Sequence, residues 1–189
     1  MKKDRKNIIL QALASMLEER NLSKITTASL AEKSKITEAA LYRHFPSKRS
    51  IYAELFSFCD NAIFTKCNEL KKNKIPSKEK VKNVFMFFMM FVEKNKGFAR
   101  LLSREALTSD EQNVSDNVNQ FYERLELVLR QMLKEDDSNL RTQPGISAQL
   151  IITTLEGNIG RYIRSKFKDS PSTYIENVWS LISVSIFKN

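Results

Sequence analysis

The chain has 189 residues, of which 42% are apolar and 28% charged, and its formal net charge is +9. This length and apolar content suffice for a buried core, and counts of only 4 glycines and 4 prolines favour long helices with few turns. The chain has no apolar run of membrane-spanning length and its first residues are charged, so we expect no membrane span, no signal peptide and a cytoplasmic protein.

Helical periodicity accounts for every strong pattern in the chain, and the sequence therefore predicts an all-α protein. The predicted helices cover residues 4–20, 28–35, 38–44, 48–72, a strongly apolar segment at 81–92, then 98–107, 114–135, 146–168 and 174–187. Thr27 and Thr37 are the predicted N-caps of the second and third helices, and Ser47 caps the fourth. We expect a domain boundary inside the fourth helix, with a head at residues 1–50 and a helical body at residues 51–189.

The fourth helix is predicted to carry Ile51, Leu55, Phe58 and Ala62 on one apolar face. Cys59 and Cys67 lie on the same helix, roughly 12 Å apart along its axis. This separation is too large for a disulfide between them. Two thiols without metal-ligand spacing suit a reducing compartment.

The second and third predicted helices form a helix-turn-helix motif. Leu30 and Ala31 on the second helix should pack against Leu41 and Phe45 on the third, with Ile36 in the turn between them. This packing leaves a polar and basic face on the third helix, which can enter a DNA major groove. The positive charge gathers here too: residues 1–50 hold 11 lysines and arginines against 5 aspartates and glutamates, a net +6, whereas the other 139 residues carry +3.

The candidate DNA-binding residues lie on or beside this helix. They are Thr27, Thr37, Glu38, Ala39, Tyr42, Arg43, His44 and Lys48. Tyr42, Lys48 and Thr27 are predicted to contact phosphates, and the small Ala39 lets the backbone approach the bases. Glu38, Arg43 and His44 are the candidates for reading base edges. The sequence thus predicts a protein that binds double-stranded DNA.

An enzyme is not expected. The chain has no glycine-rich phosphate loop, no cluster of metal ligands and no nucleophile–base pair, and its single histidine is His44. We therefore expect no catalytic residue, no metal site and no cofactor.

The last two predicted helices have features typical of a dimer interface. The candidate interface residues are Gly157, Gly160, Ile163, Trp179 and Ile182. The two glycines would let another helix approach closely, and the apolar residues would be buried by it. Burial within a single subunit is the alternative. Recognition geometry favours a homodimer, because one short helix reads few base pairs and paired recognition helices sit about 34–36 Å apart on the duplex.

The head motif resembles the TetR family of bacterial regulators. The similarity runs through Ile25-Thr-Thr-Ala-Ser-Leu-Ala and Ile36-Thr-Glu-Ala-Ala-Leu-Tyr-Arg-His-Phe-Pro-Ser-Lys. This resemblance implies an all-helical homodimer with a three-helix DNA-binding head and a body that dimerises through its last two long helices.

The body resembles the SlmA family of nucleoid occlusion factors. The similarity lies in Glu93-Lys-Asn-Lys-Gly97, Asn119-Gln-Phe-Tyr-Glu-Arg-Leu-Glu, Leu129-Arg-Gln-Met-Leu-Lys-Glu and Arg161-Tyr-Ile-Arg-Ser-Lys-Phe-Lys168. It implies a nucleoid-associated dimer that binds palindromic chromosomal sites and blocks assembly of the tubulin-like division protein FtsZ.

The same resemblance implies a groove between the fourth and fifth helices for the FtsZ C-terminal tail. The matching positions are Phe58, Lys66, Phe87, Met90, Lys94 and Asn95. Lys66 and Lys94 stand where arginine is usual, Phe87 replaces a leucine and Met90 replaces a glycine. Lysine keeps the charge but cannot bind a carboxylate through two parallel hydrogen bonds.

The alternative function is a ligand-released transcriptional repressor, the commoner role in the TetR family. It would require an apolar pocket lined by the segment Phe85 to Phe91 and by Phe121. These aromatic residues can equally fill a solid core, so we do not expect a small-molecule ligand.

Overall fold

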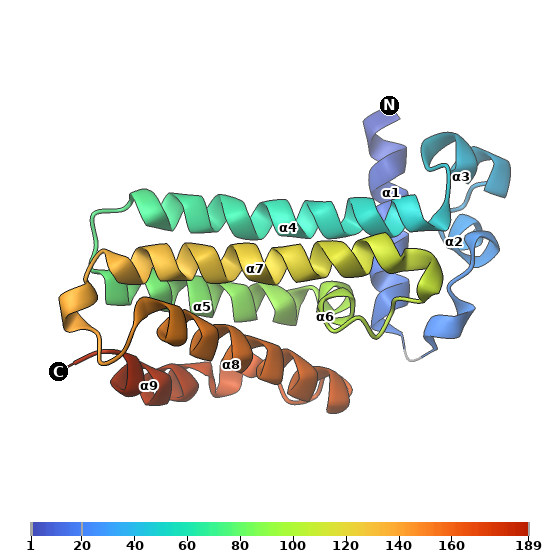
Figure 1. The fold of residues 1–189 in the computed structure, drawn as a ribbon. Helices are drawn as coiled ribbons and strands as arrows, with labels where there is room; N and C mark the ends of the chain where they lie inside the picture. Colours follow the sequence, from blue (N-terminus) through green and yellow to red (C-terminus); the bar gives the residue numbers. More distant parts are fainter. Residues whose placement is uncertain (1, 20, 189) are drawn as a thin grey trace. The chain divides into compact units, whose positions relative to one another are not determined.

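The computed structural model of the chain describes residues 2–19 and 21–188, with side chains from Arg5 onward. The secondary structure of these residues is helical, apart from one isolated antiparallel bridge between Leu140 and Phe187. The α-helices are α1 (Lys2–Glu18), α2 (Thr27–Lys33), α3 (Glu38–His44), α4 (Lys48–Lys72), α5 (Ser77–Lys94), α6 (Lys96–Leu102), α7 (Gln112–Lys134), α8 (Pro144–Arg164) and α9 (Ile175–Ile186). Figure 1 shows them in chain order, and the prediction of an all-α fold is confirmed.

The chain divides into two compact units. The first comprises residues up to Asp60 together with Asn95–Val118, and it holds α1, α2, α3, α6 and the first half of α4. The second comprises Asn61–Lys94 and Asn119–Asn189, and it holds α5, α8, α9 and most of α7. The division into residues 1–50 and 51–189 stays a prediction.

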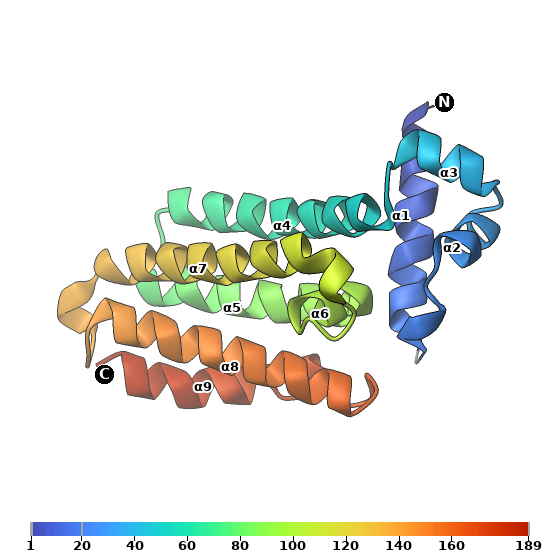
Figure 2. The ribbon, with the colours of Figure 1, turned by 45° about the vertical axis from the view of Figure 1, so that its right-hand side comes forward.

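The helix-turn-helix forms as its sequence requires. Leu30, Ala31, Leu41 and Phe45 are buried, with at most 3% of each residue exposed. The turn between the helices is closed by the Ile36 amide, which donates to the Ala31 carbonyl at 3.0 Å. Figures 1 and 2 show α2 and α3 beside each other and next to α1.

The caps explain where these helices begin. Thr37 caps α3 as predicted, since its hydroxyl accepts from the Ala40 amide at 3.2 Å. The N-cap of α2 is Thr26 rather than Thr27. Ser29 lies three residues after Thr26 and completes a reciprocal capping box with it, which Leu30 cannot do for Thr27.

Helix α6 packs on α1 with very little space between them. Gly97 is buried there, and a Cβ built on it would lie 2.9 Å from the Ala14 carbonyl oxygen. Arg100, also buried, donates to the Glu19 carbonyl just past the end of α1. This arrangement fixes the helix that supports α2.

Two helices end earlier than predicted, and the backbone gives the reason. Helix α6 begins at Lys96 and ends at Leu102 instead of reaching residue 107, because Arg104 adopts a left-handed conformation with φ 62°. Helix α8 ends at Arg164 instead of residue 168, because Lys166 and Phe167 have φ 58° and 60°. Consecutive left-handed residues cannot continue a right-handed helix.

Aromatic residues fill the core of the second unit. Phe85, Phe88 and Phe121 are fully buried, and the rings of Phe88 and Phe121 stack with centroids 6.0 Å apart. Trp179 packs against Phe85 at a centroid distance of 5.6 Å. Of the aromatic residues considered as a pocket lining, Phe85, Phe88 and Phe121 therefore pack as core, whereas Phe87 and Phe91 are half-buried.

Phe58 lies outside the buried face of α4, although helical spacing groups it with Ile51 and Leu55. It is 66% exposed, whereas Ile51, Leu55 and the neighbouring Cys59 are buried. On α4 the buried face passes through Leu55 and Cys59, four residues apart, and this leaves Phe58 on the outer side.

Candidate nucleic-acid interface and partner surfaces

The outer face of α3 carries the predicted DNA-reading residues. Tyr42 is 47% exposed, and Arg43, Glu38 and Ala39 are also exposed. His44 is half-buried. An exposed polar helix held rigidly from behind by buried apolar residues is what major-groove reading requires.

A hydrogen bond links two of the candidate residues across the motif. The Thr27 hydroxyl donates to Oε2 of Glu38 at 2.9 Å. The first residue of α2 therefore fixes the carboxylate at the first residue of α3. The structure brings these two predicted contacts together.

The start of α4 lies directly after the motif and is well capped. Ser47 and Ser50 form reciprocal bonds, each backbone amide donating to the other's hydroxyl at 3.2 Å. Lys48 is the first helical residue, with 31% of its side chain exposed and its ammonium 5.2 Å from the Tyr52 ring centre. A helix N-terminus with an adjacent lysine favours a phosphate.

The partners of the first turn of α4 come from a distant part of the chain. The Lys48 ammonium lies 3.4 Å from Oε1 of Glu111, a side chain only 1% exposed. Arg49, which was not among the candidates, donates through Nε to the Asp110 carbonyl at 2.7 Å. These partners are more than sixty residues away in sequence, so no local pattern could have revealed them.

The predicted partner-groove residues fall in both units. In the first unit, exposed Phe58 and half-buried Asn95 line a cavity of about 280 Å³. Its apolar walls include Leu10 and Ala14 of α1 and Leu55 of α4. Helix α1 was not among the candidates for this surface, because its contribution depends on tertiary packing.

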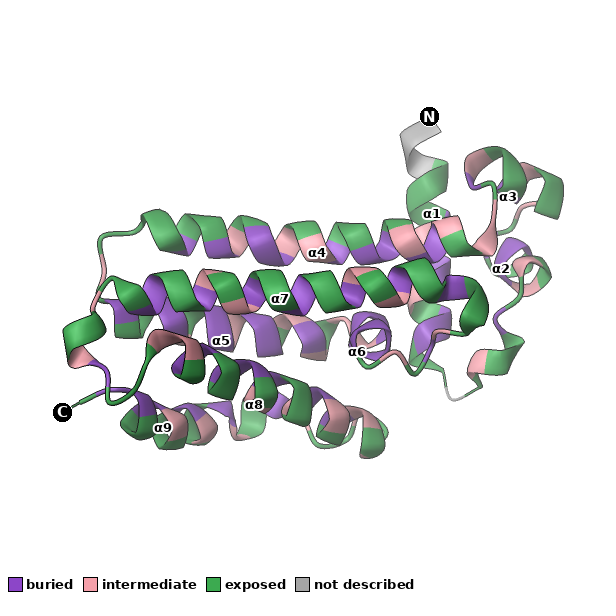
Figure 3. Ribbon diagram, viewed as in Figure 1, coloured by how far each residue is buried: buried purple, intermediate pink, exposed green. Residues whose placement is uncertain are grey.

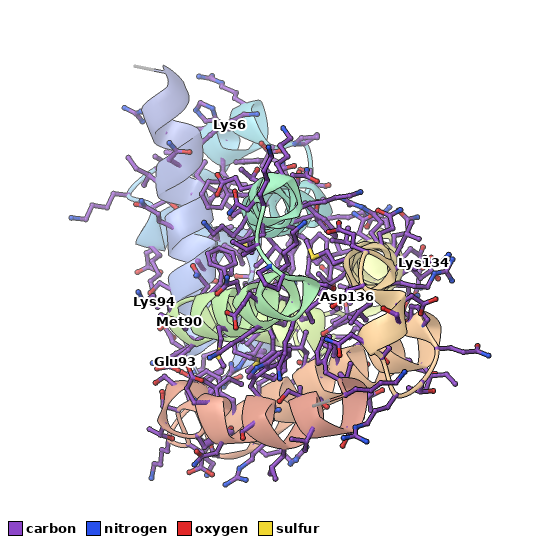
Figure 4. All side chains as sticks on the ribbon, turned by 90° about the vertical axis from the view of Figure 1, so that its left-hand side faces the viewer. Lys6, Met90, Glu93, Lys94, Lys134 and Asp136 are labelled. Atoms are coloured by element: carbon purple, nitrogen blue, oxygen red, sulfur yellow. The ribbon has the colours of Figure 1, made fainter. Side chains whose placement is uncertain are left out.

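The other predicted groove residues lie in the second unit. Met90 is 48% exposed, and Lys94 is exposed as well. Figure 4 shows Met90 and Lys94 on the same side of α5, with Glu93 nearby. Phe87 is half-buried with its ring 5.9 Å from that of Phe91.

Two acidic residues, Glu69 and Glu93, lie among the residues of this surface. Lys66 forms a surface ion pair with Glu69 at 3.1 Å. Glu93 accepts hydrogen bonds from the Ser172 amide at 2.8 Å and from the Ser172 hydroxyl at 3.0 Å. Burial raises the pKa of Glu93, but hydrogen bonds from Ser170 and Ser172 and the charge of Lys94 lower it by a larger amount, so the net shift is downward.

The face predicted for dimerisation is partly open. Gly157 is exposed, and a Cβ built there would meet nothing within 4 Å. Gly160, Ile163 and Ile182 are half-buried. Trp179 is only 4% exposed, because it packs into the core of its own subunit, and it has little surface left for a partner.

Other apolar residues extend this surface. On α9, Leu181 is 70% and Val184 is 55% exposed, and on α8 Ile146 is 54% and Leu150 is 39% exposed. Ile146, Leu150 and Gly157 share one side of α8 by their spacing. Figure 3 shows exposed positions along both helices.

The described residues provide neither a cluster of metal ligands nor a readily ionised thiol. Residues 2–19 and 21–188 contain no group of three histidine, cysteine or acidic side chains that could hold a metal ion. Burial raises the pKa of the Cys59 thiol to about 12 and that of the Cys67 thiol to about 11, so neither is a ready nucleophile. None of the helices in this part of the chain has the length and apolar character to cross a membrane.

Two family models match the chain. One, described as bacterial regulatory proteins of the tetR family, matches residues 9–55. The other, described as a tetracyclin repressor-like C-terminal domain of SlmA-like type, matches residues 77–186.

Curated relatives are similar over nearly their whole length. The chain is 37% identical over 190 residues to the nucleoid occlusion factor SlmA of Vibrio campbellii, covering 98% of this chain and 97% of that protein. It is 35% identical over 188 residues to the nucleoid occlusion factor SlmA of Vibrio cholerae, covering 97% and 96%.

Solved structures share the fold at low sequence identity. The repressor NalD of Pseudomonas aeruginosa superposes with a TM-score of 0.80 at 15% identity, covering 100% of this chain and 98% of that one. The regulator FadR of Bacillus subtilis gives a TM-score of 0.76 at 16% identity, covering 95% and 98%. With the matching family models and relatives, these structures show that the chain belongs to the TetR family of bacterial DNA-binding regulators, and within it to the SlmA-like group.

Proposed function

We propose that this protein is a nucleoid occlusion factor. As a homodimer it binds palindromic sites in double-stranded chromosomal DNA and inhibits assembly of the FtsZ ring over the nucleoid. It acts in the cytoplasm, bound to the nucleoid, and has no catalytic activity. The similarity to nucleoid occlusion factors over 98% of the chain supports this proposal.

The observation that carries the DNA-binding part is the burial pattern of α3. Leu41 is fully buried on one side of this helix, while Tyr42 is 47% exposed on the other and Arg43 is exposed beside it. Phosphate contacts from Tyr42 and Lys48 orient the helix, and Glu38 and Arg43 read base edges. The homodimer forms through the exposed apolar residues of α8 and α9, among which Leu181 is the most exposed.

The FtsZ tail binds at the exposed apolar residues of α4 and α5. Exposed Phe58 borders the cavity of about 280 Å³ in the first unit, a volume that suits one or two apolar peptide side chains. Met90 and Lys94 offer an apolar and a cationic contact in the second unit. Surface lysines give weak, salt-sensitive attraction, so Phe58 supplies most of the affinity.

A pull-down tests the partner directly. Immobilised FtsZ C-terminal peptide is mixed with the full-length protein, with and without a palindromic duplex. The proposal predicts capture in both conditions, stronger with DNA, and at least a tenfold loss for Phe58→Ala. Leu127→Ala, which removes an exposed apolar side chain of α7 outside both proposed interfaces, serves as the matched control and should retain binding to the peptide.

Failure to capture the protein in either condition would remove the FtsZ part of the proposal. If the protein binds DNA but not the peptide, it is instead a transcriptional regulator of the commoner TetR type.

A further inference from the structure

Glu111 is a buried carboxylate to which the proposed function gives no role. Its side chain is 1% exposed, and its Oε2 accepts hydrogen bonds from the amide and hydroxyl of Thr108 at 3.0 and 2.5 Å. A buried carboxylate needs a compensating charge. Lys48 supplies it, since its ammonium lies 3.4 Å from the other carboxylate oxygen of Glu111.

Lys48 holds a position where its charge matters for DNA. It is the first residue of α4, directly after the recognition motif, where the positive end of the helix also attracts phosphate. Its side chain is 31% exposed, so one side of the ammonium meets Glu111 while another meets solvent. The adjacent Arg49 is held by the same turn, through its bond to the Asp110 carbonyl.

The net charge of the pair formed by Lys48 and Glu111 is close to zero. Burial raises the pKa of Glu111, but the Thr108 hydrogen bonds and the Lys48 charge lower it by more, and the carboxylate is ionised at neutral pH. A phosphate that approaches the start of α4 meets a lysine whose charge is already compensated.

We propose that Glu111 sets the affinity of the head for the DNA backbone by neutralising Lys48. This inference rests on the proposed DNA-binding function. Glu111 acts through Lys48 and does not itself touch DNA. Because phosphate contacts are independent of sequence, weakening one of them limits binding to unrelated DNA and leaves base reading unaffected.

Glu111→Gln tests the proposal with little disturbance of the fold. Glutamine has the same shape, and it occurs naturally at this place in capping boxes such as the one that Glu111 forms with Thr108. Freeing the Lys48 charge fully should steepen the dependence of log K on log salt by up to about 0.9, which corresponds to at most roughly eightfold tighter binding at about 0.1 M salt. Both the specific duplex and an unrelated duplex should gain.

Two controls separate this effect from a general change of charge. Asp116→Asn removes an exposed carboxylate of α7 that is hydrogen-bonded to Gln112, and it should change affinity less than twofold. In a Lys48→Ala background, Glu111→Gln should no longer steepen the salt dependence, because no cation is left to be freed.

The outcomes are distinct. If Glu111→Gln binds equally or more weakly, or with an unchanged salt slope, while the wild-type protein binds DNA and Arg43→Ala weakens it, the inference is wrong and the DNA-binding role stands. If the wild-type protein binds no duplex, the proposed function fails together with the inference. If Glu111→Gln does not fold, Lys48→Arg is tested in its place. The planar guanidinium of arginine can contact Glu111 and a phosphate at the same time, so this variant should bind DNA about threefold more tightly than the wild-type protein. Equal or weaker binding would overturn the proposal.

Discussion

Gly97→Ala is predicted to destabilise the protein although alanine is the better helix former. The added Cβ would lie 2.9 Å from the Ala14 carbonyl oxygen and 3.1 Å from Cβ of Leu17. Both atoms belong to α1 and neither is the end of a flexible side chain, so α1 and α6 must separate. Overpacking of this kind costs about 1–3 kcal/mol.

The gain in helix propensity offsets at most about 1 kcal/mol of this cost. With the full offset, the net loss of unfolding free energy is about 1 kcal/mol at the middle of this range, which lowers Tm by roughly 2–4 °C for a chain of this size. Thermal unfolding followed by circular dichroism measures the shift.

Gly145→Ala is the matched control. Gly145 also lies in the first turn of a helix, but a Cβ there meets only the Arg130 side chain, at an ordinary 3.7 Å. Its Tm should change little or rise slightly. If Gly97→Ala were as stable as Gly145→Ala, the close approach of α1 and α6 would not exist in solution.

Three further predictions follow from exposed or charged residues. Arg43→Ala should weaken binding to a specific duplex by about 1–3 kcal/mol and relax selectivity at one base position, as measured by fluorescence anisotropy on single-base variants of the site. Leu181→Asp should convert the dimer to a monomer in light scattering at micromolar concentration, because a charge replaces a 70% exposed leucine in the proposed interface, whereas Leu127→Asp on α7 should stay dimeric. Glu111 has a lowered pKa in the folded protein, so its stabilising contribution is complete above the ordinary value of 4.5 and is lost as the pH falls through the lower folded value. Lowering the pH from about 6 to about 3 should therefore reduce the free energy of unfolding of the wild-type protein more than that of Glu111→Gln, as measured by urea unfolding. Equal reductions in the two proteins would contradict this expectation.

Local chemistry made the head predictable from sequence. Thr37 caps α3 and Leu41 faces inward as expected, because capping and helical periodicity act over a few residues. The choice between Thr26 and Thr27 depended on which of them could pair with Ser29. Two adjacent threonines present the same local signal, and the local pattern alone therefore predicts the cap one residue late.

Long-range packing decided what the sequence left open. The position of Phe58 depends on which of several apolar stripes of α4 meets its neighbours, and periodicity alone allowed it to point inward. Trp179 was predicted at the dimer interface because large apolar residues suit both interfaces and cores, and its contact with Phe85 places it in the core. The pairing of Lys48 with Glu111 joins α4 to the turn before α7, and no local pattern links those segments.

Selection of duplexes from a random pool by the protein shows whether it reads DNA as a dimer. We expect enrichment of a palindrome whose half-site centres are one helical turn, about 10–10.5 base pairs, or a multiple of it apart, since two α3 helices must enter successive major-groove faces. Enrichment should disappear for Arg43→Ala. A pool that shows no enriched sequence, or a single site without two-fold symmetry, would contradict the claim that this protein is a dimeric DNA-binding regulator.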